Sequence, residues 1–227
     1  MNTGLILDFL NDLIANNNRE WFNEHKDRYL AVHDEFVAIS EEFIRRIGLF
    51  DEQALGVRAQ DCIFRIYRDT RFSLDKTPYK NHLGVYVASH GGRKSLRGGY
   101  YLHLQPGASM MAAGVWCPEH EKNVLKELRQ SIYDNVDELN EIFGNAKFRK
   151  YFTDFDKTYT LKKVPQGFPS DFERADWLKL KIFCIERPLS DKEVRSDKFW
   201  DILMGACQAA KPLNDFLNYT VDEVMGY

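Results

Sequence analysis

The chain has 227 residues, of which 44% are hydrophobic and 29% charged, and its formal net charge is −3. This length allows one large domain or two small ones. The slightly acidic balance argues against a general binder of nucleic acid or anionic membranes, whose charge would be broadly positive. Only a local basic face could serve such a role.

No apolar run approaches the ~18 residues of a membrane span, and the start MNTGLILDFL has no basic region of a signal peptide. The four cysteines, Cys62, Cys117, Cys184 and Cys207, are far apart and form no CxxC pair. We therefore expect buried free thiols in a soluble, cytoplasmic chain. No GxSxG or HExxH motif occurs, and we expect no cofactor.

The N-terminal part of the chain has helical spacing. Thr3 can cap a helix that runs to Ile14, and the Asn16-Asn17-Asn18 run should end it. Apolar and aromatic residues then recur every three or four positions from about Arg19 to Ile47, which predicts one long helix lying on a sheet.

The middle of the chain changes to the period of two that is typical of strands. Alternation of apolar and polar side chains predicts strands over His82–Val87, Tyr100–Gln105 and Met110–Trp116, with Cys62–Asp69 as a fourth member. Because short turns join these segments, we expect an antiparallel meander, which with other short segments would have about four to six strands.

The C-terminal half is again mainly helical. A helix should begin at Pro118 and end near Phe143, and short strands are possible at Tyr159–Val164 and Lys181–Glu186. Further helices are predicted at Asp171–Leu180, Asp197–Ala210 and Pro212–Val224. No linker divides the chain, so we predict a single α+β domain over residues 1–227, an antiparallel sheet packed with long N-terminal, central and C-terminal helices.

The segment RIYRDTRFSLDKTPYK, residues 65–80, is the most basic part of the chain. It contains five cations and two carboxylates, for a local charge of +3. In an anion site Arg65, Arg68, Arg71 and Lys76 would hold the ligand, and Asp69 or Asp75 would orient the guanidinium groups. On a strand, Arg65 would share a face with Tyr67, whereas Arg68 and Arg71 could join them only if the chain turns.

Three interpretations of this basic segment remain open. The first is a site for a small anionic, possibly phosphorylated, ligand in a binding protein or an enzyme. The second is a non-catalytic surface for nucleic acid or a protein partner, extended by Arg93, Lys94 and Arg97. The third is a structural network in which Asp69 and Asp75 pair with the arginines and no ligand binds.

Two histidines lie on neighbouring predicted strands. If the strands pair, His82 and His103 could share a polar, aromatic face with Arg65, Tyr67, Tyr86 and Tyr101. Nearby cations would lower the pKa of both histidines, which could then serve as catalytic general base or acid. The alternative is a pair of hydrogen-bonded histidines without a catalytic role.

The other polar motifs are less specific. His82, His103 and His120 lack the close spacing of metal ligands, and no metal site is expected. Cys117 and His120 could pair as nucleophile and base only if a helix start places them together.

Several motifs together resemble a known family. RIYRDTRFSLDKTPYK, GYYLHLQPG, GVWCP, NNNREWFNEHKDRY and VPQGFPSDFERADWLKLK are similar to the bacterial domain of unknown function 2461. The resemblance covers nearly the whole chain and adds Tyr79 to the candidate ligand-binding residues. Leu74 stands where the family usually has a basic residue. The resemblance implies a single-domain cytoplasmic protein and supplies no reaction, ligand or catalytic residue.

Overall fold

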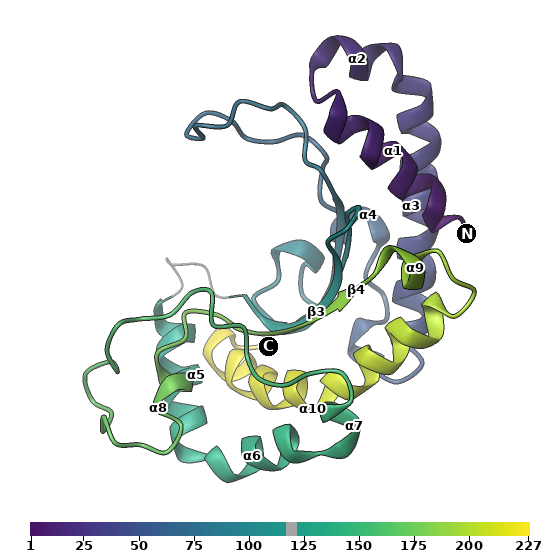
Figure 1. The fold of residues 1–227 in the computed structure, drawn as a ribbon. Coiled ribbons are helices and arrows are strands. Elements are labelled where there is room, and N and C mark those ends of the chain that lie inside the picture. Colours follow the sequence, from purple (N-terminus) through teal and green to yellow (C-terminus); the bar gives the residue numbers. More distant parts are fainter. Residues whose placement is uncertain (117–121) are drawn as a thin grey trace. The chain divides into compact units, whose positions relative to one another are not determined.

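The structure is a computed structural model that describes residues 1–116 and 122–227 (Figure 1). The chain divides into two compact units. Unit 1 comprises Met1–Lys94, Tyr101–Met111 and Pro188–Met204, and unit 2 comprises Ser95–Tyr100, Ala112–Arg187 and Gly205–Tyr227. The expectation of a single domain over 1–227 stays a prediction.

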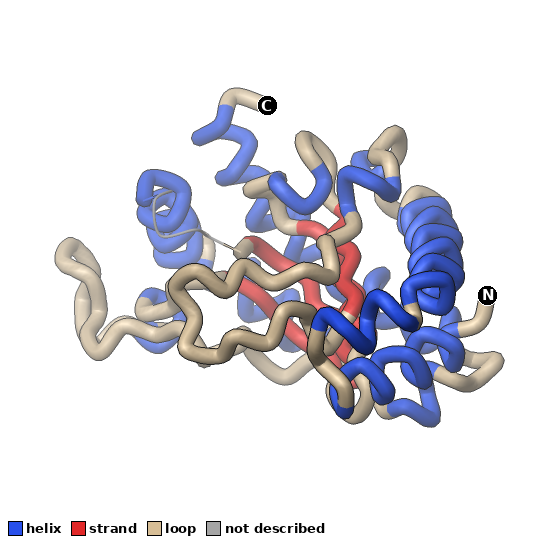
Figure 2. The backbone as a smooth tube through the Cα atoms, turned by 90° about the horizontal axis from the view of Figure 1, so that it is seen from above, coloured by secondary structure: helices blue, strands red, loops and turns tan. Residues whose placement is uncertain are grey.

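Four strands form one antiparallel sheet in the order β1-β2-β3-β4 (Figure 2). Their bounds are β1 Leu83–Val87, β2 Gly99–Leu104, β3 Ser109–Val115 and β4 Phe183–Leu189. The sheet and the surrounding helices confirm the predicted α+β class. The period of two correctly located β1, β2 and β3, and the short segment predicted at Lys181–Glu186 corresponds to β4.

The strand predicted at Cys62–Asp69 is wrong. The short helix α4, Ala59–Cys62, occupies its beginning, and isolated bridges pair Ile63 with Val85 and Tyr67 with Tyr79. The alternation of side chains was real, since Ile66 is buried and Tyr67 exposed. However, Ile63 and Phe64 pair with β1, whereas from Ile66 onward the backbone pairs with the returning end of its own loop.

Unit 1 begins with three helices, α1 Thr3–Ala15, α2 Arg19–Glu24 and α3 Lys26–Ile47. Figure 1 shows α1 beside α3, and their apolar faces are buried. Asn2, and not Thr3, caps α1 by accepting a hydrogen bond from Leu5 N at 3.0 Å. The single helix predicted from Arg19 to Ile47 is interrupted at His25, whose φ of −107° and ψ of 22° are not helical.

Short elements complete unit 1. They are η1 Glu52–Ala54, α4, η2 Gly92–Lys94 and α9 Asp191–Val194, followed by the first residues of α10, Phe199–Met225. Ser190 and Glu193 form a capping box at α9, and Thr3 Oγ1 donates to the Val194 carbonyl at 2.5 Å. These contacts fix α9 to the beginning of α1.

Unit 2 contains the helices α5 Lys122–Asp134, α6 Val136–Gly144, α7 Ala146–Arg149 and α8 Ala175–Leu178. The helix predicted from Pro118 to Phe143 is broken at Asn135, and Pro118 lies outside the described residues. The strand predicted at Tyr159–Val164 is reduced to one isolated bridge, between Thr160 and Leu180. Of the helix predicted at Asp171–Leu180 only α8 forms, because successive turns occupy the preceding residues.

The two predicted C-terminal helices are one helix, α10, which continues through Pro212. Proline lacks the N–H that would bond the carbonyl of Gln208, so a break there was a reasonable expectation. Buried side chains lie on both sides of the proline, including Ala210 and Leu213, and their packing outweighs the local cost. In the described part of the chain, no helix is long and apolar enough to cross a bilayer.

Candidate functional site

The basic segment forms a loop within unit 1, and backbone hydrogen bonds join its two ends. At its stem Arg68 N donates to the Pro78 carbonyl at 2.9 Å, and Lys80 N donates to the Ile66 carbonyl at 2.8 Å. Phe72 and Leu74 at the tip are almost completely exposed, with relative exposures of 95% and 102%. We call residues 65–80 the basic loop.

Unit 1 holds the stem of the basic loop by hydrogen bonds and stacking. Asn17 Nδ2 donates to the Tyr79 carbonyl at 3.0 Å, and Tyr79 N donates to Asn17 Oδ1 at 3.2 Å. The Tyr79 ring stacks on Phe22 with centroids 3.9 Å apart. Tyr79 is only 4% exposed, so the candidate ligand-binding residue Tyr79 anchors the loop.

Two of the three arginines in the basic loop pair with carboxylates of the same loop. Arg68 NH1 donates to Asp75 Oδ2 and to Thr77 Oγ1, and Arg71 NH2 lies 2.6 Å from Asp69 Oδ2. Hydrogen bonds lower the pKa of both aspartates to about 2: Asp69 accepts from Arg71, and Asp75 accepts from Thr77 N and from Arg68. These arginines therefore have internal counter-ions.

Lys76 also bonds within the loop, since its Nζ donates to the Thr70 carbonyl at 2.9 Å. Arg97, proposed as part of an extended basic surface, is 4% exposed, and its NH1 lies 2.6 Å from Asp222 Oδ1. Arg97 therefore does not contribute to an exposed cationic surface.

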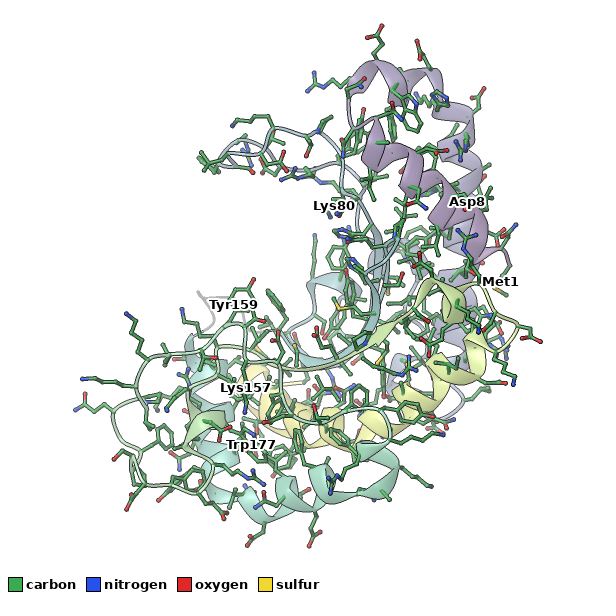
Figure 3. The ribbon with its side chains drawn as sticks, viewed as in Figure 1. Met1, Asp8, Lys80, Lys157, Tyr159 and Trp177 are labelled. Atoms are coloured by element: carbon green, nitrogen blue, oxygen red, sulfur yellow. The ribbon has the colours of Figure 1, made fainter. Side chains whose placement is uncertain are left out.

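Arg65 and Lys80 differ from the other cations of the basic loop. Within the described part of the chain, neither side chain has a carboxylate at ion-pair distance. Lys80 is half-buried at the C-terminal end of the basic loop (Figure 3), and its Nζ lies 5.5 Å from the centroid of Phe64. Burial, together with the positive charge of Arg65, lowers the pKa of Lys80.

The two candidate histidines lie together beside Lys80. The His82 and His103 rings are stacked with centroids 4.2 Å apart and planes 27° apart. His82 immediately precedes β1, and His103 is in the neighbouring strand β2. Strand pairing therefore brings the histidines to the same face of the sheet, as their positions on predicted neighbouring strands suggested.

Hydrogen bonds define the tautomers of both neutral rings. The Tyr101 hydroxyl lies 3.0 Å from His103 Nδ1, and His103 Nε2 lies 2.9 Å from Gln105 Oε1. Because the amide oxygen only accepts, Nε2 carries the proton and Nδ1 accepts from Tyr101. Likewise His82 Nδ1 lies 2.9 Å from Asn81 Oδ1, which leaves the lone pair on His82 Nε2 without a partner among the described residues.

Burial is the main cause of the low basicity of these histidines. Burial, His103 and Lys80 lower the pKa of His82 to about 3, and burial and Lys80 lower the pKa of His103. The hydrogen bond between His103 and Gln105 acts in the opposite direction on His103, and no carboxylate of the described residues contributes to either shift. At neutral pH the stacked rings are therefore uncharged, and Lys80 has no carboxylate partner among the residues that the structure describes.

Glycine and aromatic residues make room for this arrangement. A Cβ on Gly84 would lie 2.6 Å from the Tyr101 hydroxyl oxygen, so only glycine leaves the tyrosine its position across β1. The Phe64 ring meets Tyr101 edge-on, with centroids 6.1 Å apart. Burial raises the pKa of Tyr101 to about 12, so the hydroxyl remains a donor to His103.

The structure thus places the candidate site residues in three locations. His82 and His103 lie beside Lys80 and Arg65 at the stem of the basic loop. Farther along the loop Arg68 pairs with Asp75, Arg71 pairs with Asp69, and Lys76 bonds to the Thr70 carbonyl, whereas Tyr79 stacks on Phe22. Sequence reasoning gave no role to Phe64, Asn81 or Gln105. Tyr101, His103 and Gln105 lie at every second position of a predicted strand and therefore on one face, and this spacing could have identified Gln105 as a neighbour of His103.

A metal centre has no support in the described residues, where no three His, Cys, Asp or Glu side chains gather closely enough to hold an ion. The proposed pair of Cys117 and His120 lies outside the described residues. The cysteines that are described, Cys62, Cys184 and Cys207, are free thiols.

Comparison with protein families identifies the class of this chain. Residues 5–216 match the model of a family described as conserved hypothetical protein (DUF2461). The chain therefore belongs to this family, as its motifs suggested. Searches of curated proteins and of solved structures found no match.

Proposed function

We propose that unit 1 binds a small anionic ligand, possibly phosphorylated, beside Lys80 and His82. The observation that carries the proposal is Lys80, a half-buried ammonium group beside Phe64 and His82 that has no carboxylate at ion-pair distance among the described residues. The positive charge of Arg65 lowers the pKa of Lys80, and it also acts on Asp69. A half-buried ammonium group is stabilised by an opposite charge within a few ångströms. An anion from solution would supply that charge.

Each residue of this site has a distinct role in the proposal. Lys80 provides a point charge, and the exposed Arg65 guanidinium provides a planar fork for a carboxylate or phosphate. His82 Nε2 accepts a hydrogen bond or a proton from the ligand, and the Tyr101–His103–Gln105 chain holds His103 beside it. A general acid–base role for His82 and His103 belongs to this proposal, which does not depend on catalysis.

The two alternative interpretations of the basic loop concern residues other than Lys80 and Arg65. The ion pairs of Arg68 and Arg71 favour the structural network for the outer part of the loop. The same pairs weaken the case for a nucleic-acid surface, because fewer unpaired cations remain. The free thiols fit a reducing, cytoplasmic location, which is part of the proposal.

Lys80→Met tests the proposal, with Lys76→Met as its matched control. Both changes remove one ammonium group from the basic loop, but the Lys76 ammonium group bonds to the Thr70 backbone carbonyl. Inorganic phosphate binding is measured by calorimetry, and the histidine ring protons are titrated by NMR with and without phosphate. A charge-assisted hydrogen bond contributes about 1.5–3 kcal/mol, so Lys80→Met should weaken binding by roughly ten-fold or more.

Bound phosphate should also raise the pKa of His82, because an anion favours the charged ring. Equal losses in the two lysine variants would show that only general charge attraction operates. Binding with unchanged histidine titration would place the anion elsewhere on the protein.

A further inference from the structure

Unit 2 contains a long groove that is separate from the anion site. Residues from α5, α6, α7 and α10 line it, and Figure 1 shows α6 and α7 running alongside the part of α10 that belongs to unit 2. Its volume is about 1560 Å³. Sites for small molecules usually measure about 300–1,000 Å³, so this groove has the capacity for a chain segment.

The groove is strongly acidic. Among the described residues, eight charged side chains line it. Lys147 and Lys150 are basic, and six are carboxylates: Glu127, Asp134, Glu138, Glu141, Asp215 and Glu223. Three of the carboxylates have partners, since Glu127 pairs with Lys126, Asp215 pairs with Lys211 and Asp134 accepts from Gln130. Within the described residues, Glu138, Glu141 and Glu223 have no ion pair or hydrogen bond from a side chain.

Apolar surface lies between these carboxylates. Phe148 and Phe216 form a buried floor, with exposures of 2% and 8%, and Ile142 and Val224 are half-buried along it. Tyr219 adds a ring that is 68% exposed. The lining therefore combines an apolar floor with negative charge and is unsuited to a purely polar ion.

Two features of α10 shape the wall of the groove. Gly205 has no side chain, so the Tyr151 ring lies against it; a Cβ at this position would be 3.0 Å from Tyr151 Cζ. Pro212 lacks the N–H that would bond the Gln208 carbonyl in a regular helix, and both residues line the groove.

We propose that the groove binds a cationic amphipathic helix of a partner protein. Its apolar side chains would pack on Phe216, Ile142 and Val224, and its lysines or arginines would pair with Glu141 and Glu223. This is the helix-in-groove mode of recognition, in which apolar residues on one helix face supply affinity. Complementary charge then sets the orientation of the helix and speeds its association.

Binding of a fluorescent amphipathic Leu/Lys peptide to the full-length chain tests the proposal by anisotropy. The variant Glu141→Lys/Glu223→Lys should weaken binding at least about ten-fold, since each exchange replaces an attraction by a repulsion. Asp171→Lys/Glu186→Lys is the matched control: it makes the same change in net charge at exposed carboxylates of unit 2 outside the groove lining. The control should stay within about two-fold of the wild type. Tyr219→Ser should weaken binding several-fold through lost apolar contact.

Three results would overturn the proposal. Equal weakening by the two double variants would mean that the peptide follows net charge alone. Displacement of the peptide by spermidine, together with an unaffected Tyr219→Ser variant, would identify a polyamine site. Self-association in sedimentation that Glu141→Lys/Glu223→Lys abolishes, without peptide binding by the monomer, would assign the groove to a second copy of the chain.

Discussion

Acidification should destabilise the protein through His82. The pKa of this histidine is about 3 in the folded chain, against an ordinary value of 6.5. Between these values the unfolded state binds more protons, so the free energy of unfolding falls as the pH falls. From about pH 7.5 to about pH 5.5 a fully effective shift removes about 1.4 kcal/mol. His82 is partly exposed, and solvent screening reduces the expected loss to about 1 kcal/mol.

Urea unfolding at several pH values measures this effect. His82→Gln should flatten the pH dependence by about 1 kcal/mol over the same interval, because glutamine does not titrate. His33→Gln, which replaces a histidine of α3 whose side chain is 41% exposed, is the control for the same substitution elsewhere in the chain. The pKa of Asp69 and of Asp75 is about 2, so these carboxylates titrate below the interval. Identical slopes in wild type and His82→Gln would refute the reasoning.

Two further predictions concern backbone space and the basic loop. Gly114→Ala should prevent stable folding, because φ at this position is +116° and a Cβ would lie 2.9 Å from Cys184 Cα. Gly144→Ala is the control and should fold normally, since a Cβ at Gly144 would meet open space. Circular dichroism and thermal melting measure both outcomes. Arg68→Ala should speed chymotrypsin cleavage within the loop more than Arg71→Ala does, because the Arg68 side chain is 24% exposed and bonds several loop groups, whereas Arg71 is 77% exposed. Equal cleavage rates would show that these bonds do not order the loop.

The fold could be predicted from the sequence wherever local pattern and packing agree. Alternating side chains located β1 to β3, because each strand has one buried face. The pattern failed at Cys62–Asp69, where the same alternation belongs to a loop stem, and at Pro212, where burial on both sides overrides the helix-breaking proline. In both segments the tertiary contacts decide the backbone conformation, and these contacts cannot be read from a single sequence.

The candidate site was predictable to a similar extent. Placing His82 and His103 on adjacent strands predicted that they could share a face of the sheet; the stacking of their rings was not predicted, and their role stays a prediction. The choice between a ligand and an internal carboxylate for Arg68 and Arg71 was not predictable, because it depends on how residues 69–77 turn. Lys80 stands out only when its burial and the absence of a nearby counter-ion in the described chain are known.

The bonds between Asn17 and Tyr79 have a consequence for hydrogen exchange. The amide hydrogens of Arg68, Tyr79 and Lys80 all have acceptors inside unit 1, so they should exchange only when the stem opens as one cooperative unit. Because the acceptor for the Tyr79 amide is the Asn17 side chain between α1 and α2, loosening of the N-terminal helices should speed exchange of the Tyr79 amide hydrogen. Residues near the proposed anion site would thereby report the local stability of a segment more than sixty positions earlier in the chain.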